Sequence, residues 1–346
     1  MAYSTIVKPS DYFNTKLYTG NGGTQAVTGV GFQPDWVWLK KRNGTAPHNV
    51  FDAVRGVTKT IYTNLSEAEY TEATALTAFG TDGFTLGAYG DTNSNSATFA
   101  SWNWKAGTGQ GSSNTDGSIN TTYTSVNTTA GFSISSFTGT GANATFGHGL
   151  GAVPKMYILK RYDASNNWRV YHESLGNGKY ITLETTEAAQ TSSGFTNNTS
   201  PTSSLISLGN LGSANPSGGS VICYAFAEKK GYSKFGSYTA NGNADGTFVY
   251  TGFKPAMIII KRSSSTEDWE IIDNKRLGYN VANYDLRPNS TMAEANYTPM
   301  DLLSNGFKLR STNASINGSG TFIYMAFAEE PLVANSGTDG VPATAR

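Results

Sequence analysis

The apolar residues of this chain fall in short runs that are separated by clusters of glycine, asparagine, serine and aspartate. Such runs predict β-strands, and turn residues between them predict tight connections. Toward the C-terminus, the pattern predicts seven strands, at residues 233–238, 247–253, 257–262, 269–273, 279–286, 306–311 and 321–329. About seven short strands per hundred residues is typical of two packed antiparallel sheets, of jelly-roll or immunoglobulin type.

The same order of runs occurs three times along the chain. Residues 19–42, 138–161 and 239–262 each pass from a Gly/Asn turn to a proline, and then to an apolar run closed by two basic residues. Downstream, a leucine precedes the last aromatic residue of the final strand by 18 residues in every copy: Leu86 to Trp104, Leu208 to Phe226 and Leu309 to Phe327. An identical spacing in three places is not expected by chance, so the chain contains a long internal repeat.

We therefore predict an all-β protein of three tandem antiparallel β-sandwich domains. They cover residues 13–106 (repeat 1), 124–230 (repeat 2) and 231–331 (repeat 3), after an N-terminal segment, 1–12, and before a tail, 332–346. Residues 107–123 are almost free of apolar side chains, which predicts a flexible linker. Repeats 2 and 3 follow one another without a spacer. We expect them to form a stiff pair, with repeat 1 hinged from it.

Two finer features follow from comparing the copies. Ser66-x-x-Glu69 and Thr291-x-x-Glu294 have the form of a capping box and predict one helical turn each. In the final strands, one face carries large residues and predicts the core. The other face carries Cys223 where its counterparts are Ser101 and Tyr324, so we expect a tolerant face and an unreactive thiol.

Charge and composition exclude several classes of function. Lys plus Arg and Asp plus Glu both number 25, so no field attracts nucleic acid or an anionic membrane. No apolar run is long enough to cross a membrane, and no secretion signal precedes the first repeat, so we expect synthesis in a cytoplasm. Aromatic residues make up 12% of the chain, which argues against disorder.

Candidate catalytic groups are few. Asp52 and Asp273 occupy equivalent positions after the basic strand ends, and His172 replaces them in repeat 2. We interpret these aspartates as partners in partly exposed ion pairs between neighbouring strands. The three histidines lack metal-ligand spacing, and Cys223 is the single cysteine. We predict no enzyme, no metal and no cofactor.

Sugar contact is the remaining chemistry to consider. Trp168 and Trp269 each follow a polar loop, and their counterpart in repeat 1 is His48. A flat ring stacks on the apolar face of a sugar, while amides and carboxylates hold its hydroxyl groups. We therefore treat these three residues, with Asn166 and Asp268, as candidate glycan contacts. Hydrophobic plugs that close the end of a sandwich are the alternative.

The strings LYTGNGGTQAVTGVGFQPDWVWLKKR, ASWNWKAGTG, TGTGANATFGHGLGAVPKMYILKR and LLSNGFKLRS resemble the tandem modules of virion structural proteins from tailed bacteriophages, especially marine ones. The likeness covers residues 13–331. It implies a virion protein associated with the tail or resembling a fibre, and no established catalytic or binding residues come with it.

These observations lead to three functional hypotheses. The first is a noncatalytic tail fibre or receptor-binding protein in the virion, assembled as a homotrimer with other virion proteins, that contacts a host surface glycan or receptor. The second is a decoration or structural protein of the head or tail. The third, a polysaccharide depolymerase, requires two opposed carboxylates that the sequence does not display.

Overall fold

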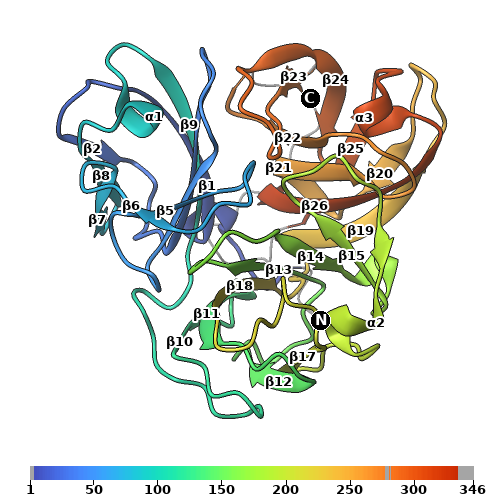
Figure 1. The fold of residues 1–346 in the computed structure, drawn as a ribbon. Helices are drawn as coiled ribbons and strands as arrows, with labels where there is room; N and C mark the ends of the chain where they lie inside the picture. Colours follow the sequence, from blue (N-terminus) through green and yellow to red (C-terminus); the bar gives the residue numbers. More distant parts are fainter. Residues whose placement is uncertain (1–3, 277–279, 281, 334–346) are drawn as a thin grey trace.

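The computed structural model describes residues 4–276, 280 and 282–333. It is an all-β structure of several antiparallel sheets, and each repeat contributes strands to two or more of them. Figure 1 shows three lobes, one for each repeat in chain order, gathered around a common centre. The prediction of an all-β protein is confirmed.

Repeat 1 follows a 3₁₀ turn, η1 (Pro9–Asp11), and forms two sheets with strand orders β1-β9-β3-β4-β5-β6 and β2-β8-β7. Its elements are β1 (Phe13–Thr19), β2 (Gln25–Thr28), β3 (Trp36–Lys41), β4 (Asn49–Asp52), β5 (Lys59–Tyr62), β6 (Tyr70–Thr71), β7 (Leu76–Gly80), β8 (Gly83–Leu86), α1 (Gly90–Asn93) and β9 (Thr98–Trp104).

Repeat 2 has the sheet orders β10-β11-β18-β13-β14-β15-β16 and β12-β17. Its elements are β10 (Tyr123–Asn127), β11 (Phe132–Thr138), β12 (Ala144–Gly147), β13 (Met156–Arg161), β14 (Arg169–His172), η2 (Glu173–Leu175), β15 (Lys179–Thr182), β16 (Gln190–Thr191), α2 (Ser193–Thr196), β17 (Leu205–Leu208) and β18 (Ser220–Phe226).

Repeat 3 has the sheet orders β19-β26-β21-β22 and β20-β25-β24-β23. Its elements are β19 (Ser233–Ala240), β20 (Phe248–Tyr250), β21 (Phe253–Arg262), β22 (Trp269–Asp273), β23 (Ala282–Asp285), β24 (Ala295–Leu303), β25 (Gly306–Leu309), α3 (Ala314–Asn317) and β26 (Gly320–Pro331). All seven predicted strands of this repeat have a counterpart, and β24 is an eighth strand that the pattern missed.

The predicted helical turns are wrong in position. Residues 66–69 are irregular backbone, and Glu294 directly precedes β24. The short helical turns lie later in each repeat, at α1, α2 and α3. The capping-box residues instead make contacts between repeats, which explains why their spacing recurs without a helix.

The central strands of each repeat are buried on both faces. On β9, Trp102 and Trp104 face a core cluster that contains residues of all three repeats. On the opposite face of the equivalent strand β18, Cys223 lies in a second cluster, formed by repeat 2 and by Ile119 of the segment before it. The expectation of a tolerant outer face is therefore wrong, because the sheet packs on both sides.

Aromatic rings from different repeats meet at the centre of the molecule. The ring of Phe226 lies 5.9 Å from the ring of Trp36 and 6.0 Å from the ring of Phe327, measured between centroids. Phe13 stacks on Phe327 at 5.0 Å. Repeat 1 therefore packs against both other repeats, and these contacts do not support a hinge between repeat 1 and the rest.

The segment 107–123, predicted to be a flexible linker, hydrogen-bonds to both repeats that it joins. At its beginning, the Asp35 carboxylate accepts hydrogen bonds from the backbone N–H groups of Ala106, Thr108 and Gly109, at 2.7 to 3.1 Å. Near its end, Ile119 N–H donates to the Thr145 carbonyl at 2.8 Å. The composition of this segment predicted that it is polar, but it did not predict these hydrogen-bond partners. The predicted C-terminal tail lies outside the described residues from position 334 onward.

Candidate functional site

The three repeats meet at three seams, where residues of one repeat bond to the next in a cyclic order. A buried lysine marks each seam. Lys160 of repeat 2 donates to the Ser66 carbonyl of repeat 1 at 2.9 Å. Lys261 of repeat 3 donates to Thr186 of repeat 2 at 3.1 Å, and Lys40 of repeat 1 donates to Thr291 of repeat 3 at 3.2 Å.

Burial lowers the pKa of each of these three lysines to about 8. Each ammonium group also donates to a carbonyl of its own repeat, for example Lys261 to Glu267 at 2.8 Å. One lysine of each basic pair that closes an apolar run is therefore buried in a seam, where it bonds to the neighbouring repeat. Their recurrence in the sequence reflects the assembly of the repeats.

Backbone hydrogen bonds strengthen the same seams. The carbonyls of Ser66, Thr186 and Thr291 also accept from backbone N–H groups of the next repeat, at 2.7 to 3.0 Å. In repeat 2 the equivalent residue is Thr186.

The equivalent residues Asp52, His172 and Asp273 also bridge the seams. Asp52 accepts a hydrogen bond from the Tyr224 hydroxyl at 2.7 Å, and Asp273 accepts one from Trp102 Nε1 at 3.0 Å. His172 Nε2 lies 3.1 Å from the Tyr324 carbonyl oxygen. Each contact joins a repeat to the following one in the cycle, and each of the three side chains is buried.

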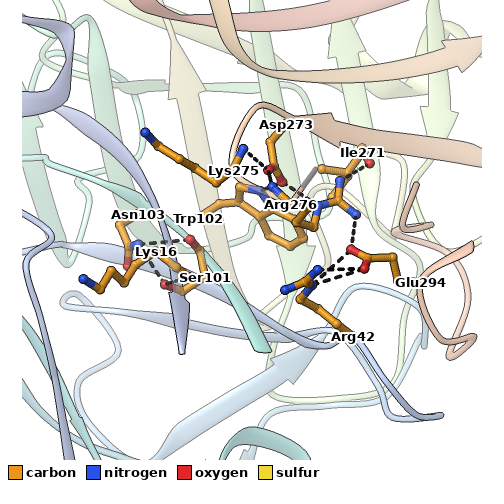
Figure 2. Close-up of polar contacts among 10 residues, drawn as sticks. All are labelled: Lys16, Arg42, Ser101, Trp102, Asn103, Ile271, Asp273, Lys275, Arg276 and Glu294. Carbon is orange, nitrogen blue, oxygen red and sulfur yellow. Dashed lines mark hydrogen bonds and ion pairs between the residues drawn. The ribbon is translucent and has the colours of Figure 1, made fainter. Parts of the chain in front are cut away.

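Arginines neutralise the two aspartates. Arg276 Nε lies 2.7 Å from Asp273, and its Nη1 lies 3.2 Å from Glu294. Glu294 in turn pairs with Arg42 of repeat 1 at 2.9 Å, so one network spans two repeats, as Figure 2 shows. The interpretation of Asp52 and Asp273 as members of partly exposed ion pairs is therefore wrong. Both pairs are buried because they lie inside the seams.

The predicted sugar-stacking rings are not exposed. His48 and Trp168 have no exposed surface, and Trp269 has 2%. Trp168 Nε1 donates to the Tyr62 carbonyl and Trp269 Nε1 to the Thr182 carbonyl, each across a seam, at 2.9 and 3.0 Å. A ring with no free face cannot stack on a sugar. Both tryptophans instead pack in the core cluster that the three repeats share.

Asn166 and Asp268 are half-buried and bond within the protein. The Asn166 amide donates to the Gly212 carbonyl at 3.1 Å, and its backbone N–H donates to Ser66. The Asp268 carboxylate pairs with Arg287 at 2.8 Å and accepts from Asn289 at 2.7 Å. The structure therefore does not join the five predicted sugar contacts into one surface. It distributes them over the three seams.

The seam between repeats 3 and 1 contains an open groove of about 330 Å³. The groove is lined by Asn14, Thr15, Lys16, Leu17, Gly29 and Lys275. In Figure 2, the side chains of Lys16 and Lys275 extend away from the buried Arg276–Asp273 pair. In the described part of the chain, neither lysine has a carboxylate within ion-pair distance. This groove is the candidate binding site.

The groove residues are not among the residues predicted from the sequence, although the repeats contain a signal for them. The strand registers place Thr15 opposite Trp102, Ile134 opposite Tyr224 and Phe235 opposite Met325. Thr15 is therefore the polar member of a position that is otherwise apolar. Comparing the first strands of the three repeats would have shown this departure.

A model of one protein family, described as a domain of unknown function (DUF7483), matches residues 8–331. The chain belongs to the DUF7483 family. The match spans all three repeats, in agreement with the core that they share. No curated protein and no solved structure matches the chain.

Two general features of the described residues bear on the site. They contain no group of three or more His, Cys, Asp or Glu side chains placed to hold a metal ion. None of the helices among them has the length and apolar character needed to span a membrane.

Burial raises the pKa of the Cys223 thiol well above its usual value, since the side chain lies inside the core of repeat 2.

Proposed function

We propose that this member of the DUF7483 family is a noncatalytic bacteriophage virion protein, a tail fibre or receptor-binding protein that contacts the host surface. In this proposal, each repeat is a two-sheet β-sandwich module and the three modules act as one rigid body. The resemblance of the repeat sequences to virion modules supports the assignment, and so does the arrangement of the seams.

The observation that carries the proposal is the use of the charged groups at the seams. The buried lysines and aspartates at equivalent positions bond to neighbouring repeats and hold them together, and the arginines pair with these aspartates within one repeat. A catalytic pair needs side chains that are free to meet a substrate, whereas these are fixed in structural bonds. Such a use of charge suits a protein that presents a stable outer surface.

The virion assembly is part of the proposal. A homotrimer would gain avidity from repeated weak contacts with the host. Light scattering on the purified protein tests this assembly, and three times the chain mass is the expected result. A mass of one chain would overturn the homotrimer and leave the receptor-binding role to a monomer.

Immunogold labelling of intact virions tests the location. Label at the tail tip or along fibres is expected, and label over the whole head at high copy would favour a decoration protein. Incubating the purified protein with host polysaccharide tests for hydrolysis. New reducing ends would overturn the noncatalytic assignment.

A further inference from the structure

The groove between repeats 3 and 1 carries two ammonium groups on polar surroundings. Lys16 comes from β1 and Lys275 from the turn after β22, so the two charges belong to different repeats. The nearby carboxylate of Glu329 is 2.8 Å from Lys254, which offsets its charge. The Asp82 carboxylate, which accepts hydrogen bonds from the backbone N–H groups of Gly29 and Gly31, lies on the Lys16 side of the groove and partly offsets the charge of that lysine. The two lysines line the groove without an ion-pair partner and give it a positive potential, which an anionic ligand would lower.

The other two seams show that the groove is a departure from the repeat pattern. The residue of repeat 1 that is equivalent to Lys275 is Val54, which is buried in the central core. Where β1 carries Thr15, the equivalent strands carry Ile134 and Phe235, both in the same core. In repeat 2 the residue equivalent to Lys275 is Ser174, which is exposed. The position of Thr15 is therefore apolar in both other repeats, whereas the position of Lys275 is apolar only in repeat 1 and carries a positive charge only in repeat 3.

The Thr15 hydroxyl is a second sign of a binding site. Thr15 is 5% exposed and lines the groove, yet its Oγ1 has no hydrogen-bond partner among the described residues. A buried hydroxyl without a partner costs free energy, and an oxygen-rich ligand would supply one. In addition, β1 is an edge strand paired only with β9, so half of its backbone polar groups face away from the sheet.

We infer that this groove binds one acidic sugar residue of a host polysaccharide through its carboxylate. The lysines hold the carboxylate, and the Thr15 hydroxyl and the Asn14 side of the β1 edge meet the sugar hydroxyls. This inference rests on the proposed receptor-binding function and names the class of receptor. A groove of about 330 Å³ lies at the small end of ligand sites, which suits one sugar ring.

The chemistry of the groove favours a carboxylate on a sugar over a phosphate. Both charges are lysines, which act as point charges, whereas arginine provides the bidentate fork that matches phosphate. The remaining lining offers a hydroxyl, an amide and the partly buried Leu17 side chain. Hydrogen-bonding groups beside a small apolar surface are what a sugar ring requires.

The test is a titration of the full-length protein with a glucuronic acid oligosaccharide, followed by calorimetry or NMR. The double variant Lys16→Ala/Lys275→Ala should weaken binding about tenfold or more, because each lysine makes a charge-assisted contact. The matched control is Lys179→Ala, an exposed lysine at the start of β15 in repeat 2, which should bind as the unmodified protein does. Raising the salt concentration should weaken binding.

A second variant keeps the test independent of charge removal. Thr15→Ile introduces the side chain that repeat 2 carries at the equivalent position, so it should fill the groove without unfolding the protein. Loss of glucuronate binding with an unchanged or higher melting temperature supports the inference. Unchanged binding by this variant and by the double lysine variant overturns it.

Three comparison ligands separate the alternatives. A neutral glucose oligosaccharide of equal length should not bind. Inorganic phosphate, or a short glutamate peptide, bound more tightly than the acidic sugar would overturn the assignment to sugar. Adhesion of the protein to host cells, measured in parallel, separates the two proposals. If cells bind the unmodified protein and the Thr15→Ile variant equally, receptor binding stands and the groove is not its site.

Discussion

His172 occupies the position at which the other two repeats carry Asp52 and Asp273. Its two ring nitrogens are both engaged, since Nδ1 accepts from Ser174 N–H at 3.2 Å and Nε2 faces the Tyr324 carbonyl at 3.1 Å. This pattern fits a neutral imidazole with its proton on Nε2. A neutral ring needs no arginine partner, and Leu175 stands where the aspartates have arginines.

The buried ring makes folding sensitive to acid. Burial lowers the pKa of His172 to about 4, whereas an unfolded histidine titrates near 6.5. Between these pH values, His172 is protonated in the unfolded chain but neutral in the folded protein. Stability therefore falls as pH drops from about 6.5 to about 4. This shift in pKa corresponds to a decrease of about 3 kcal/mol in the free energy of unfolding at the lower end of that pH range.

Urea denaturation across this pH range checks the effect of His172. His172→Gln keeps a donor for the Tyr324 carbonyl but does not titrate. Its stability relative to the unmodified protein should therefore rise as pH falls through the window. A difference that stays constant with pH would contradict the assignment of a neutral buried ring.

Arg276 provides a second test at single-residue resolution, because it touches two carboxylates in the seam between repeats 3 and 1. Arg276→Met leaves Asp273 and Glu294 without this cation, and removing one member of a buried pair costs about 3–5 kcal/mol. The control is Lys8→Met, which breaks an exposed pair with Asp11 and should cost less than about 1 kcal/mol. Equal losses in urea denaturation would contradict the structural role of the seam network.

At the scale of elements, the sequence predicted the strands well, because turn residues and apolar runs are local signals. The proline-to-basic run of repeat 3 became β21, and the final run became β26. The errors lie where local pattern depends on a distant partner. Ser66-x-x-Glu69 has the spacing of a helix cap, but Ser66 and Glu69 bond to repeat 2 instead.

The same limit applies to the candidate sites. Trp168 follows a polar loop, which is typical of an exposed ring, and yet a neighbouring repeat covers it. No local signal states that a second repeat will pack there. The groove could have been found from the sequence through the odd residue Thr15, but its opening depends on how repeats 3 and 1 meet.

The segment 107–123 supports a prediction at this scale. The Asp35 carboxylate accepts three backbone hydrogen bonds where repeat 1 passes into this segment, two of them from the segment itself. Gln110 donates to the Val54 carbonyl at 3.1 Å. Asp35→Ala removes the acceptor for Ala106, Thr108 and Gly109, so this part of the segment should open to protease. Limited proteolysis should cut the variant near residues 107–112 faster than the unmodified protein.

The control for this experiment is Asp116→Ala, a change in the exposed part of the same segment. It should leave the rate of cleavage at residues 107–112 unchanged. Equal cleavage of the Asp35→Ala variant and the unmodified protein would show that the aspartate does not fix the segment. First cleavage near Gly231 in either protein would place the most accessible joint between repeats 2 and 3.

At the scale of the whole molecule, the shared core changes what a repeat is. Each repeat has apolar clusters of its own, but the inner faces of β9, β18 and β26 meet in a single cluster. A repeat on its own would expose this inner face to water, which large apolar side chains make costly. Each repeat also bonds to both of the others across the seams, so the three repeats form a closed ring of contacts.

This arrangement predicts that the three repeats unfold together. Phe226 lies at the centre, with its ring 5.9 Å from Trp36 of repeat 1, 5.9 Å from Phe235 and 6.0 Å from Phe327 of repeat 3. Phe226→Ala should cost about 3–5 kcal/mol and lower one shared melting transition in calorimetry. Hydrogen exchange should quicken in the sheets of all three repeats, because losing the central ring weakens every seam. Phe248→Ala, at an exposed position of β20, should leave the transition nearly unchanged. Separate transitions, or faster exchange confined to repeat 2, would show instead that the repeats are thermodynamically independent and that their common core contributes little to cooperativity.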